Sequence, residues 1–124
     1  MDKIIIPVVP KSLNQLLRSH WSYKGKLKRE YQILVVNQMR LNKIRKTEIG
    51  EAWNVTIYSY RTKLLDMDNL IGGCKPILDS LSMEGFIWDD SDAYLICRYF
   101  QQTAPKGKRY TEIIREKIET NAKR

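Results

Sequence analysis

Length, composition and charge favour a soluble single-domain protein. The chain has 124 residues, of which 43% are hydrophobic and 29% are charged, and its formal net charge is +8. This length favours one compact domain, and the composition excludes a disordered tail. No apolar run approaches the ~20 residues of a membrane-spanning helix, so no membrane partner is expected.

The N-terminus and the two cysteines bear on cellular location. The apolar start of the chain is interrupted by Pro7 and Pro10, and no small-residue cleavage site follows, which argues against a secretory signal. Cys74 and Cys97 lie in apolar contexts without CxxC spacing, which is typical of buried free thiols in a reducing compartment. We therefore expect a cytoplasmic protein.

The first half of the chain predicts a strand, a loop, a long helix and a second strand. Residues 4–9, IIIPVV, are β-branched and predict a short strand, and the polar segment after Pro10 predicts a loop. Apolar residues recur at three- and four-residue spacing from about residue 24 to residue 47, which predicts a helix with one apolar face. Residues 52–61, AWNVTIYSYR, alternate between two sides, as in a strand.

The second half predicts a helix and two more strands. Helical spacing follows the acidic segment, but two glycines and Pro76 weaken a helix interior. We therefore expect this helix to begin near residues 73–75 and to end near Gly85. Residues 93–100 predict a third strand, and a turn rich in Pro, Gly and Lys joins it to residues 110–119. These last residues fit a strand or a helix, and we expect a strand that completes a hairpin, because the turn directly joins two β-prone segments.

The order of these elements is β-α-β-α-β-β. It predicts an α/β or α+β fold in which two helices flank a mixed sheet. We expect residues 1–120 to form this single domain and residues 121–124 to form a frayed C-terminal tail.

Charge is unevenly distributed along the chain. Residues 1–62 contain 12 Lys/Arg and 4 Asp/Glu, residues 63–96 contain 2 and 7, and residues 97–124 contain 8 and 3. An acidic segment is thus flanked by two basic regions. The basic regions point to a polyanionic partner, with nucleic acid as the first candidate, because basic side chains near phosphates release condensed counterions. A small basic protein without such a partner can have the same composition.

The acidic segment predicts a site for a divalent cation. Asp66 and Asp68 share one side of the chain if it is still extended there. Asp89, Asp90 and Asp92 follow a helix long enough to bring them back beside the start of the segment. Clustered carboxylates repel each other unless a cation lies among them, and oxygen ligands without His or Cys favour Mg²⁺ or Mn²⁺. Such an ion can activate water for the hydrolysis of a phosphodiester.

Other interpretations of the same residues stay open. Asp68 or Asn69 can simply make a turn or a helix cap, and Asp89 and Asp90 can solvate a loop. A calcium-binding EF-hand is excluded, since Ile71 stands where that loop requires Gly. A sugar-nucleotide transferase would use the same metal chemistry, but the chain is short for it. Lys75 is four residues from Asp79, which fits either a surface ion pair or a positive charge at the scissile phosphate.

The pattern of the acidic segment resembles the RusA family of Holliday junction resolvases, which occur in bacteria and their phages. It reads D-x-D-N, then K-x-x-x-D, then G-F-x-x-D-D. The matching residues are Asp66, Asp68, Asn69, Lys75, Asp79, Gly85, Phe86, Asp89 and Asp90. Three extra residues separate Asn69 from Lys75 relative to the shorter form of the motif, and we expect a loop before the helix to absorb them.

The resemblance implies a homodimeric, magnesium-dependent endonuclease that cuts four-way DNA junctions by paired incisions. It implies that Asp66, Asp68 and Asp90 are catalytic carboxylates that bind Mg²⁺, with Mn²⁺ as a substitute, that Asp89 is a further metal ligand, and that Lys75 is a catalytic lysine. A dimer suits a symmetric four-way substrate, because it places two identical sites on two opposed strands. The residues expected to contact DNA are Arg18, His20, Lys24, Lys26, Lys28, Arg61 and Lys63.

Two further functions stay open beside the nuclease. A non-catalytic module that binds branched DNA would bind junctions but would not nick them in Mg²⁺, and its carboxylates would be structural. A metal-dependent enzyme for another phosphate or sugar-nucleotide substrate would bind metal without affinity for branched DNA. His20 fits phosphate binding or base stacking, and it equally fits an ordinary exposed loop histidine.

Overall fold

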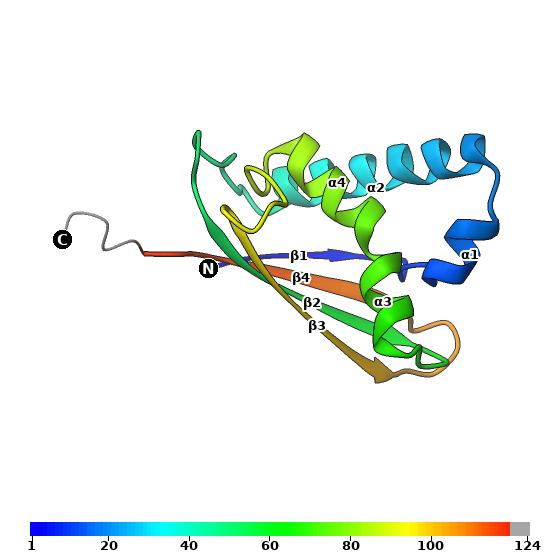
Figure 1. The fold of residues 1–124 in the computed structure, drawn as a ribbon. Helices are drawn as coiled ribbons and strands as arrows, with labels where there is room; N and C mark the ends of the chain where they lie inside the picture. Colours follow the sequence, from blue (N-terminus) through cyan, green and yellow to red (C-terminus); the bar gives the residue numbers. More distant parts are fainter. Residues whose placement is uncertain (120–124) are drawn as a thin grey trace.

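The computed structural model describes residues 1–119, so the expected tail at 121–124 lies outside the described residues. Four strands form one mixed sheet in the order β1-β4-β2-β3, and all of the labelled helices lie on the same face of it (Figure 1). The α/β fold with a mixed sheet is confirmed, with two short helices in addition to the two expected. The elements are β1 (Asp2–Ile6), α1 (Leu13–Arg18), α2 (Trp21–Leu41), β2 (Trp53–Arg61), α3 (Met67–Gly73), α4 (Lys75–Glu84), β3 (Leu95–Thr103) and β4 (Tyr110–Lys117).

The sheet pairs its strands in a different order from the one expected. β4 lies between β1 and β2 and is antiparallel to both, whereas β3 is parallel to β2. The strand at residues 110–119 is confirmed, but its hairpin with the preceding strand is wrong, because β2 lies between β3 and β4. A parallel pair needs a long crossover, and α3 and α4 supply it between β2 and β3.

A short helix replaces the loop expected after Pro10. Ser12 caps α1, since its Oγ accepts a hydrogen bond from the Gln15 backbone N at 3.1 Å and the Gln15 side chain accepts one from the Ser12 backbone N at 3.0 Å. These reciprocal bonds are a capping box. The sequence S-x-x-Q carried this signal, because Ser and Gln at that spacing before apolar residues are typical of a helix start.

The long helix α2 ends at Leu41 rather than near residue 47. Lys43 has a φ of 54°, and the Ile44 backbone N donates to the Met39 carbonyl oxygen at 2.9 Å, while Lys43 N donates to Arg40 O at 3.2 Å. This is a Schellman motif, in which a left-handed residue closes the last turn. Glycine usually takes that position, so a lysine there gave no sequence signal.

The glycines before Lys75 permit a close approach of two segments instead of forming a loop. A Cβ atom at Gly73 would lie 1.8 Å from the Lys11 carbonyl oxygen, and one at Gly72 would lie 2.8 Å from the Leu13 side chain. The extra residues of the motif are thus absorbed in the helix α3, which packs against α1. α4 begins at Lys75 and is followed by Gly85, at a φ of 82°, as expected.

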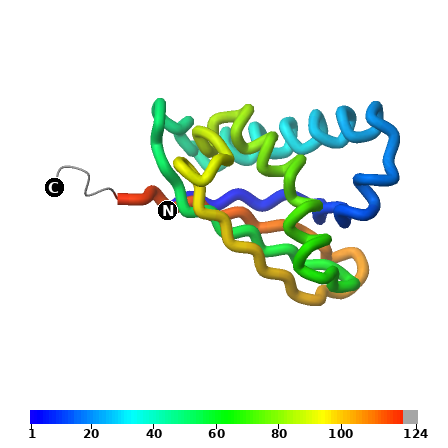
Figure 2. The backbone as a smooth tube through the Cα atoms, viewed as in Figure 1, coloured from blue at the N-terminus to red at the C-terminus, as the bar shows by residue number. Residues whose placement is uncertain are grey.

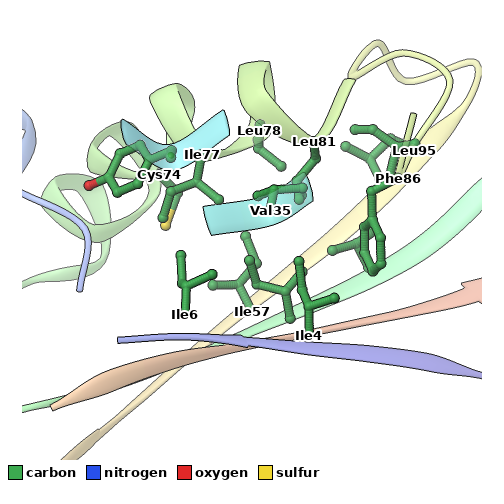
Figure 3. Close-up of a cluster of buried hydrophobic side chains, with 14 of the residues drawn as sticks. Ile4, Ile6, Val35, Ile57, Cys74, Ile77, Leu78, Leu81, Phe86 and Leu95 are labelled. Atoms are coloured by element: carbon green, nitrogen blue, oxygen red, sulfur yellow. The ribbon is translucent and has the colours of Figure 1, made fainter. Parts of the chain in front are cut away.

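The core lies between the sheet and the helices α2 and α4. Ile4, Val35, Ile57, Leu81 and Phe86 come from five different segments, and all are buried there (Figure 3). The two cysteines add to this side of the sheet as free thiols, one of them buried and the other half-buried. Within residues 1–119, no helix combines the length and the apolar character needed to cross a membrane.

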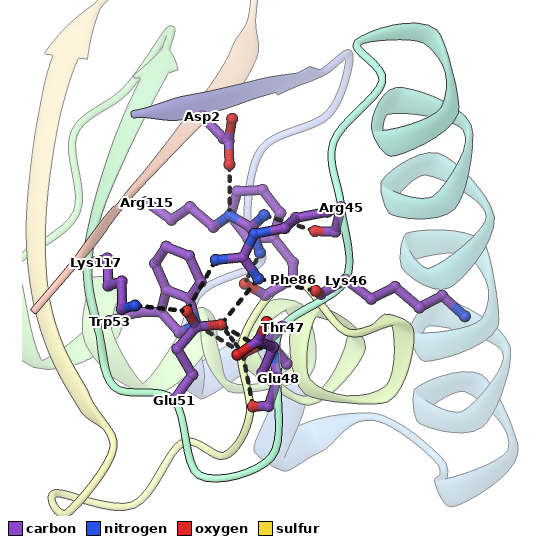
Figure 4. A network of polar contacts seen from close by, with 10 residues as sticks. All are labelled: Asp2, Arg45, Lys46, Thr47, Glu48, Glu51, Trp53, Phe86, Arg115 and Lys117. Carbon is purple, nitrogen blue, oxygen red and sulfur yellow. Dashed lines mark hydrogen bonds and ion pairs between the residues drawn. The ribbon is translucent and has the colours of Figure 1, made fainter.

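A buried arginine joins the sheet to the connection between α2 and β2. Arg115 is fully buried, and its guanidinium donates to Asp2 Oδ2 at 2.9 Å and to the carbonyl oxygens of Phe86 at 2.8 Å and Arg45 at 2.6 Å (Figure 4). The same group lies 4.2 Å from the centre of the Trp53 ring. Its charge is thus matched by a carboxylate and by carbonyl dipoles inside the chain.

Glu51, in the segment between α2 and β2, is a second residue whose charge is matched by partners inside the chain. Its carboxylate accepts two hydrogen bonds from Arg45, at 3.0 and 2.8 Å, and others from Thr47 Oγ1 and the Glu48 backbone N. These bonds, led by those of Arg45, lower the pKa of Glu51 to about 2. We call Asp2, Arg45, Glu51 and Arg115 the matched cluster.

Candidate functional site

Asp66 and Asp68 lie at the start of α3, not at the end of a strand as predicted. Asp66 is the N-cap, and its Oδ1 accepts a hydrogen bond from the Asn69 backbone N at 2.9 Å. The Asn69 side chain donates to both Asp66 oxygens as well. These bonds lower the pKa of Asp66, which keeps its carboxylate ionised. The cap therefore lies at Asp66, whereas the alternative interpretation had placed a cap or a turn at Asp68 or Asn69.

Several carboxylates of the acidic segment have no basic partner. Asp68 is exposed in the first turn of α3, where the helix dipole favours a negative charge. Among residues 1–119, neither Asp66 nor Asp68 forms an ion pair, and the same holds for Asp89 and Asp92. Their negative charge is available to a cation from outside the chain.

Lys75 joins the helix α4 to the loop that carries Asp90. Its ammonium group forms an ion pair with Asp90, and its Nζ lies 3.2 Å from Asp79 Oδ1. Asp79 lies 3.5 Å from Lys28 Nζ of α2 as well. The hydrogen bond to Asp90 is the main cause that raises the pKa of Lys75, so the amine stays protonated. The predicted pair with Asp79 is confirmed, and Lys75 points toward the acidic loop.

The two ends of the acidic segment lie on the same side of the sheet. The Gln101 side chain on β3 accepts a hydrogen bond from the Leu65 backbone N at 3.0 Å and donates to its carbonyl oxygen, which fixes the residue before Asp66. Tyr99 lies two residues earlier on the same face of β3. Burial raises its pKa, and the nearby negative charge of Asp90 contributes to the shift. Asp90 and the residue that precedes Asp66 thus both lie near the helix-covered face of β3.

We call Asp66, Asp68, Lys75, Asp89 and Asp90 the acidic site. Within residues 1–119, no three acidic, histidine or cysteine side chains converge closely enough to hold a metal ion. Lys75 supplies the positive charge at Asp90 in this arrangement. The donor chemistry fits Mg²⁺ nevertheless, because the carboxylates are hard oxygen ligands and three of them have no basic partner in the described part of the chain. The metal site stays a prediction.

A basic region adjoins the acidic site through α1. The Asn14 backbone N donates to Asn69 Oδ1 at 2.9 Å, so the amide that bonds Asp66 is fixed by α1 in turn. Arg18 lies at the other end of this short helix and is exposed. The trace in Figure 2 shows the turn between β3 and β4 at the same end of the sheet as α1 and α3.

Two hollows extend along this basic end. One, of about 420 Å³, is lined by Lys11, Gln15, Arg18, Ser19, His20 and Tyr23. The other has a similar volume, shares Lys11 and Tyr23, and reaches Glu30 on α2 and Arg109 beyond the β3–β4 turn. His20 caps α2 by accepting from the Ser22 backbone N at 3.1 Å, and its ring lies 5.3 Å from that of Trp21, which is 77% exposed.

The residues predicted to contact DNA fall into two groups. Arg61 is buried, and its guanidinium donates to the carbonyl oxygens of Pro10 at 2.9 Å and Lys63 at 3.0 Å. It therefore holds the chain before α1 in place and has no free face for a phosphate, which differs from the prediction. The other predicted residues are exposed or half-buried, and they are Arg18, His20, Lys24, Lys26, Lys28 and Lys63.

Sequence reasoning missed three residues that shape this region. Trp21 and Arg109 border the basic end, and Gln101 anchors the segment before Asp66. An exposed tryptophan cannot be told from a buried one by type alone, and Gln101 sits 35 residues from Asp66 in the sequence. Only the sheet topology brings them to the site.

The chain matches no protein-family model, and it matches no curated protein sequence to a significant degree. The resemblance to the RusA resolvases therefore depends on the motif residues of the acidic segment. The geometry of these residues is the basis for the proposal below.

Proposed function

We propose that this protein is a magnesium-dependent endonuclease that resolves four-way DNA junctions by paired phosphodiester hydrolysis, in recombination and repair. The observation that carries the proposal is the acidic site itself: a protonated lysine beside Asp90 on the same side of the sheet as two aspartates without a basic partner among residues 1–119. A purely structural cluster would match its charges internally, as the cluster around Arg115 does.

The chemistry follows from the residue types. Asp66, Asp68 and Asp90 would hold Mg²⁺, with Asp89 as a further ligand, and the bound ion would supply a water of lowered pKa and polarise the phosphate. Water oxygen attacks phosphorus, the bond to the 3′ oxygen breaks, and the products are a 5′-phosphate and a 3′-hydroxyl. Lys75 places positive charge where negative charge develops on the phosphate oxygens.

The basic end of the molecule fits the DNA backbone in this proposal. Arg18 and Lys11 line the hollow beside α1, and Arg109 lines the hollow that joins it. The bond between Asn14 and Asn69 couples this surface to the carboxylate of Asp66. Phosphates bound along α1 and α2 are thereby positioned with respect to the acidic site.

Two further parts of the proposal concern assembly and location. We infer that the protein acts as a homodimer, because a two-fold axis places two acidic sites on opposed strands of a four-way junction. We also infer a cytoplasmic location, which the two free and largely buried thiols support.

A cleavage assay tests the proposed function. An end-labelled four-way junction and a linear duplex of the same arm sequence are incubated with the purified protein in Mg²⁺, in Mn²⁺ and in EDTA. We expect paired nicks in opposed strands of the junction in either metal, and none in EDTA or in the duplex. Junction binding without nicking in both metals would instead identify the non-catalytic module. Metal binding without junction affinity would identify an enzyme for a different phosphate substrate.

A further inference from the structure

The hollow that reaches Glu30 is bordered by three segments that are distant in the sequence. Its walls come from the segment after β1, from the helix α2 and from the turn between β3 and β4, and its volume is about 420 Å³. Val8, Leu27 and Leu34 give it an apolar floor. We call it the α2 hollow. A concave site of this size, with apolar walls and a few polar groups, is typical of a site for a small ligand group.

The wall that carries Lys11 is held in place on both sides. The buried Arg61 donates to the Pro10 carbonyl oxygen at 2.9 Å. The Lys11 carbonyl oxygen lies against Gly73, where a Cβ atom would be 1.8 Å from it. Gly73 lies two residues before Lys75 of the acidic site. The wall is therefore preformed, and it contacts the segment that leads into the acidic site.

Glu30 is the only Asp or Glu in the sequence of α2, and it lines the α2 hollow. It is exposed, and among residues 1–119 it forms no ion pair, although Lys11 and Arg109 line the same hollow. A carboxylate on a basic surface repels phosphates and weakens their binding. It becomes favourable where the bound polyanion presents hydrogen-bond donors, and the donors of DNA lie on its bases. The carboxylate of Glu30 thus suits a base and not the backbone.

Tyr23 supplies an aromatic surface at the same place. It lines both hollows of the basic end, and it is 39% exposed. Within the described part of the chain, its ring stacks on no other aromatic ring. A base can therefore stack on it, while Lys11 and Arg109 bind the adjoining phosphates.

We propose that the α2 hollow receives one unpaired base of the bound DNA strand, and that Glu30 selects bases with an exocyclic amino group over thymine. The base stacks on Tyr23, and its amino group donates to the Glu30 carboxylate. Adenine, cytosine and guanine carry such a group. Thymine presents a carbonyl oxygen in its place, which the carboxylate repels.

A four-way junction supplies an unpaired base at low cost. Extruding a base costs least where its pairing and stacking are already interrupted, and the stacks of a junction are interrupted at the branch point. The inference rests on the proposed function, since it takes DNA as the ligand of the basic end. It adds a preference for base type, which the acidic site alone does not provide.

Fluorescence anisotropy with end-labelled oligonucleotides tests the inference without cleavage. Oligodeoxycytidine and oligodeoxyuridine of about twelve residues are compared in EDTA, because an amino group in one base replaces a carbonyl oxygen in the other. We expect the wild-type protein to bind the cytidine oligonucleotide at least about 5-fold more tightly. Glu30→Gln should abolish this preference, since an amide can donate to the carbonyl oxygen as well as accept from the amino group.

Two further substitutions separate the roles of charge and stacking. Glu116→Gln removes the same charge from an exposed residue on β4, and it should keep the preference. Tyr23→Ala should weaken the binding of both oligonucleotides at least about 5-fold through the loss of stacking, whereas Tyr23→Phe should bind like the wild type. Circular dichroism shows that each variant is folded, and the isosteric Glu30→Gln decides the preference if Tyr23→Ala is not.

The outcomes distinguish this inference from the nuclease. Equal binding of the two oligonucleotides by the wild-type protein, or a preference that survives in Glu30→Gln, would overturn the base site alone. A protein that binds junctions but neither oligonucleotide would overturn it as well. A preference for cytidine in a protein that does not cut junctions in Mg²⁺ or Mn²⁺ would overturn the nuclease and support the base site. Absence of binding to any of these DNAs would overturn both.

Discussion

The matched cluster and the acidic site both contain several charged side chains, but they differ in how many of these charges have partners within the described chain. In the matched cluster, Arg115 is fully buried and every charged group has a partner in the chain (Figure 4). In the acidic site, Asp66, Asp68 and Asp89 have no basic partner among residues 1–119, and the side chain of Lys75 is 59% exposed.

The difference separates a structural role from a binding role. A buried charge with internal partners fixes the positions of the segments that it joins, and its removal leaves those partners unsatisfied. Exposed charges of one sign contribute little to folding and repel each other, so their value lies in what they bind. The comparison predicts that substitutions in the matched cluster change stability and substitutions in the acidic site change activity.

The largest effect is expected at Asp68. We expect Asp68→Asn to lower junction cleavage at least about 1,000-fold, equivalent to ~4 kcal/mol of transition-state stabilisation, because an amide is a poor ligand for Mg²⁺. Junction binding, measured by gel shift in EDTA, should be unchanged. Glu116→Gln is the control, since Glu116 is exposed on β4 and lies outside the acidic segment. Normal cleavage by Asp68→Asn would contradict the assignment.

Arg115→Met tests the structural role of the matched cluster. It leaves Asp2 and two carbonyl oxygens without their donor, and we expect it to lower the free energy of unfolding by about 3–5 kcal/mol. Urea denaturation measures the change. Lys117→Met, which removes an exposed lysine 3.5 Å from Glu51, should cost less than about 1 kcal/mol. If the two variants lowered the free energy of unfolding equally, the burial of the substituted residue would not determine the loss of stability.

Glu51 makes the stability of the matched cluster dependent on pH. Its pKa is lowered to about 2 in the folded protein, so its contribution is complete above its ordinary range near pH 4.5 and is lost as the pH falls toward 2. Glu51→Gln should lower the free energy of unfolding by about 1–3 kcal/mol at neutral pH. It should also reduce the loss of stability that accompanies the fall in pH from 4.5 to 2. Urea midpoints between pH 2 and 7 measure both. If the variant lost stability at low pH as steeply as the wild type, other carboxylates would control the pH dependence.

The smallest effect on stability is expected at Lys75. Lys75→Gln removes two ion pairs of a largely exposed side chain, and we expect the free energy of unfolding to change by less than about 1 kcal/mol. Cleavage should nevertheless fall, because the variant has no positive charge to offer the phosphate. A large loss of stability would place Lys75 with the structural residues and would remove the distinction drawn above.

The periodic elements could be predicted from the sequence, and the pairing of the strands could not. Alternation in residues 52–61 identified β2, and the spacing of Leu27, Tyr31 and Val35 identified the buried face of α2. The expected hairpin failed because a strand's own sequence does not record which strand lies beside it. β4 is separated from β1 by more than 100 residues, yet the two strands are paired.

The acidic site was predicted in its residue types and only partly in its geometry. Helical spacing and a charge count located Lys75 beside Asp79, since both are local properties. A cap was considered at Asp68 or Asn69, but it forms at Asp66, because its hydrogen bonds depend on the conformation of the chain after Leu65. Arg61 was assigned to DNA because it is basic, whereas its burial depends on the distant Pro10 carbonyl.

The position of β4 has a consequence for the synthesis of the protein. This strand comes last among the described elements, yet it lies inside the sheet, where it pairs with β1 on one side and with β2 on the other. During translation, β1 and β2 therefore wait without a shared partner until residues 110–117 leave the ribosome. The sheet is therefore completed only when this last strand is available, and we expect a chain that ends before residue 110 to lack the complete core.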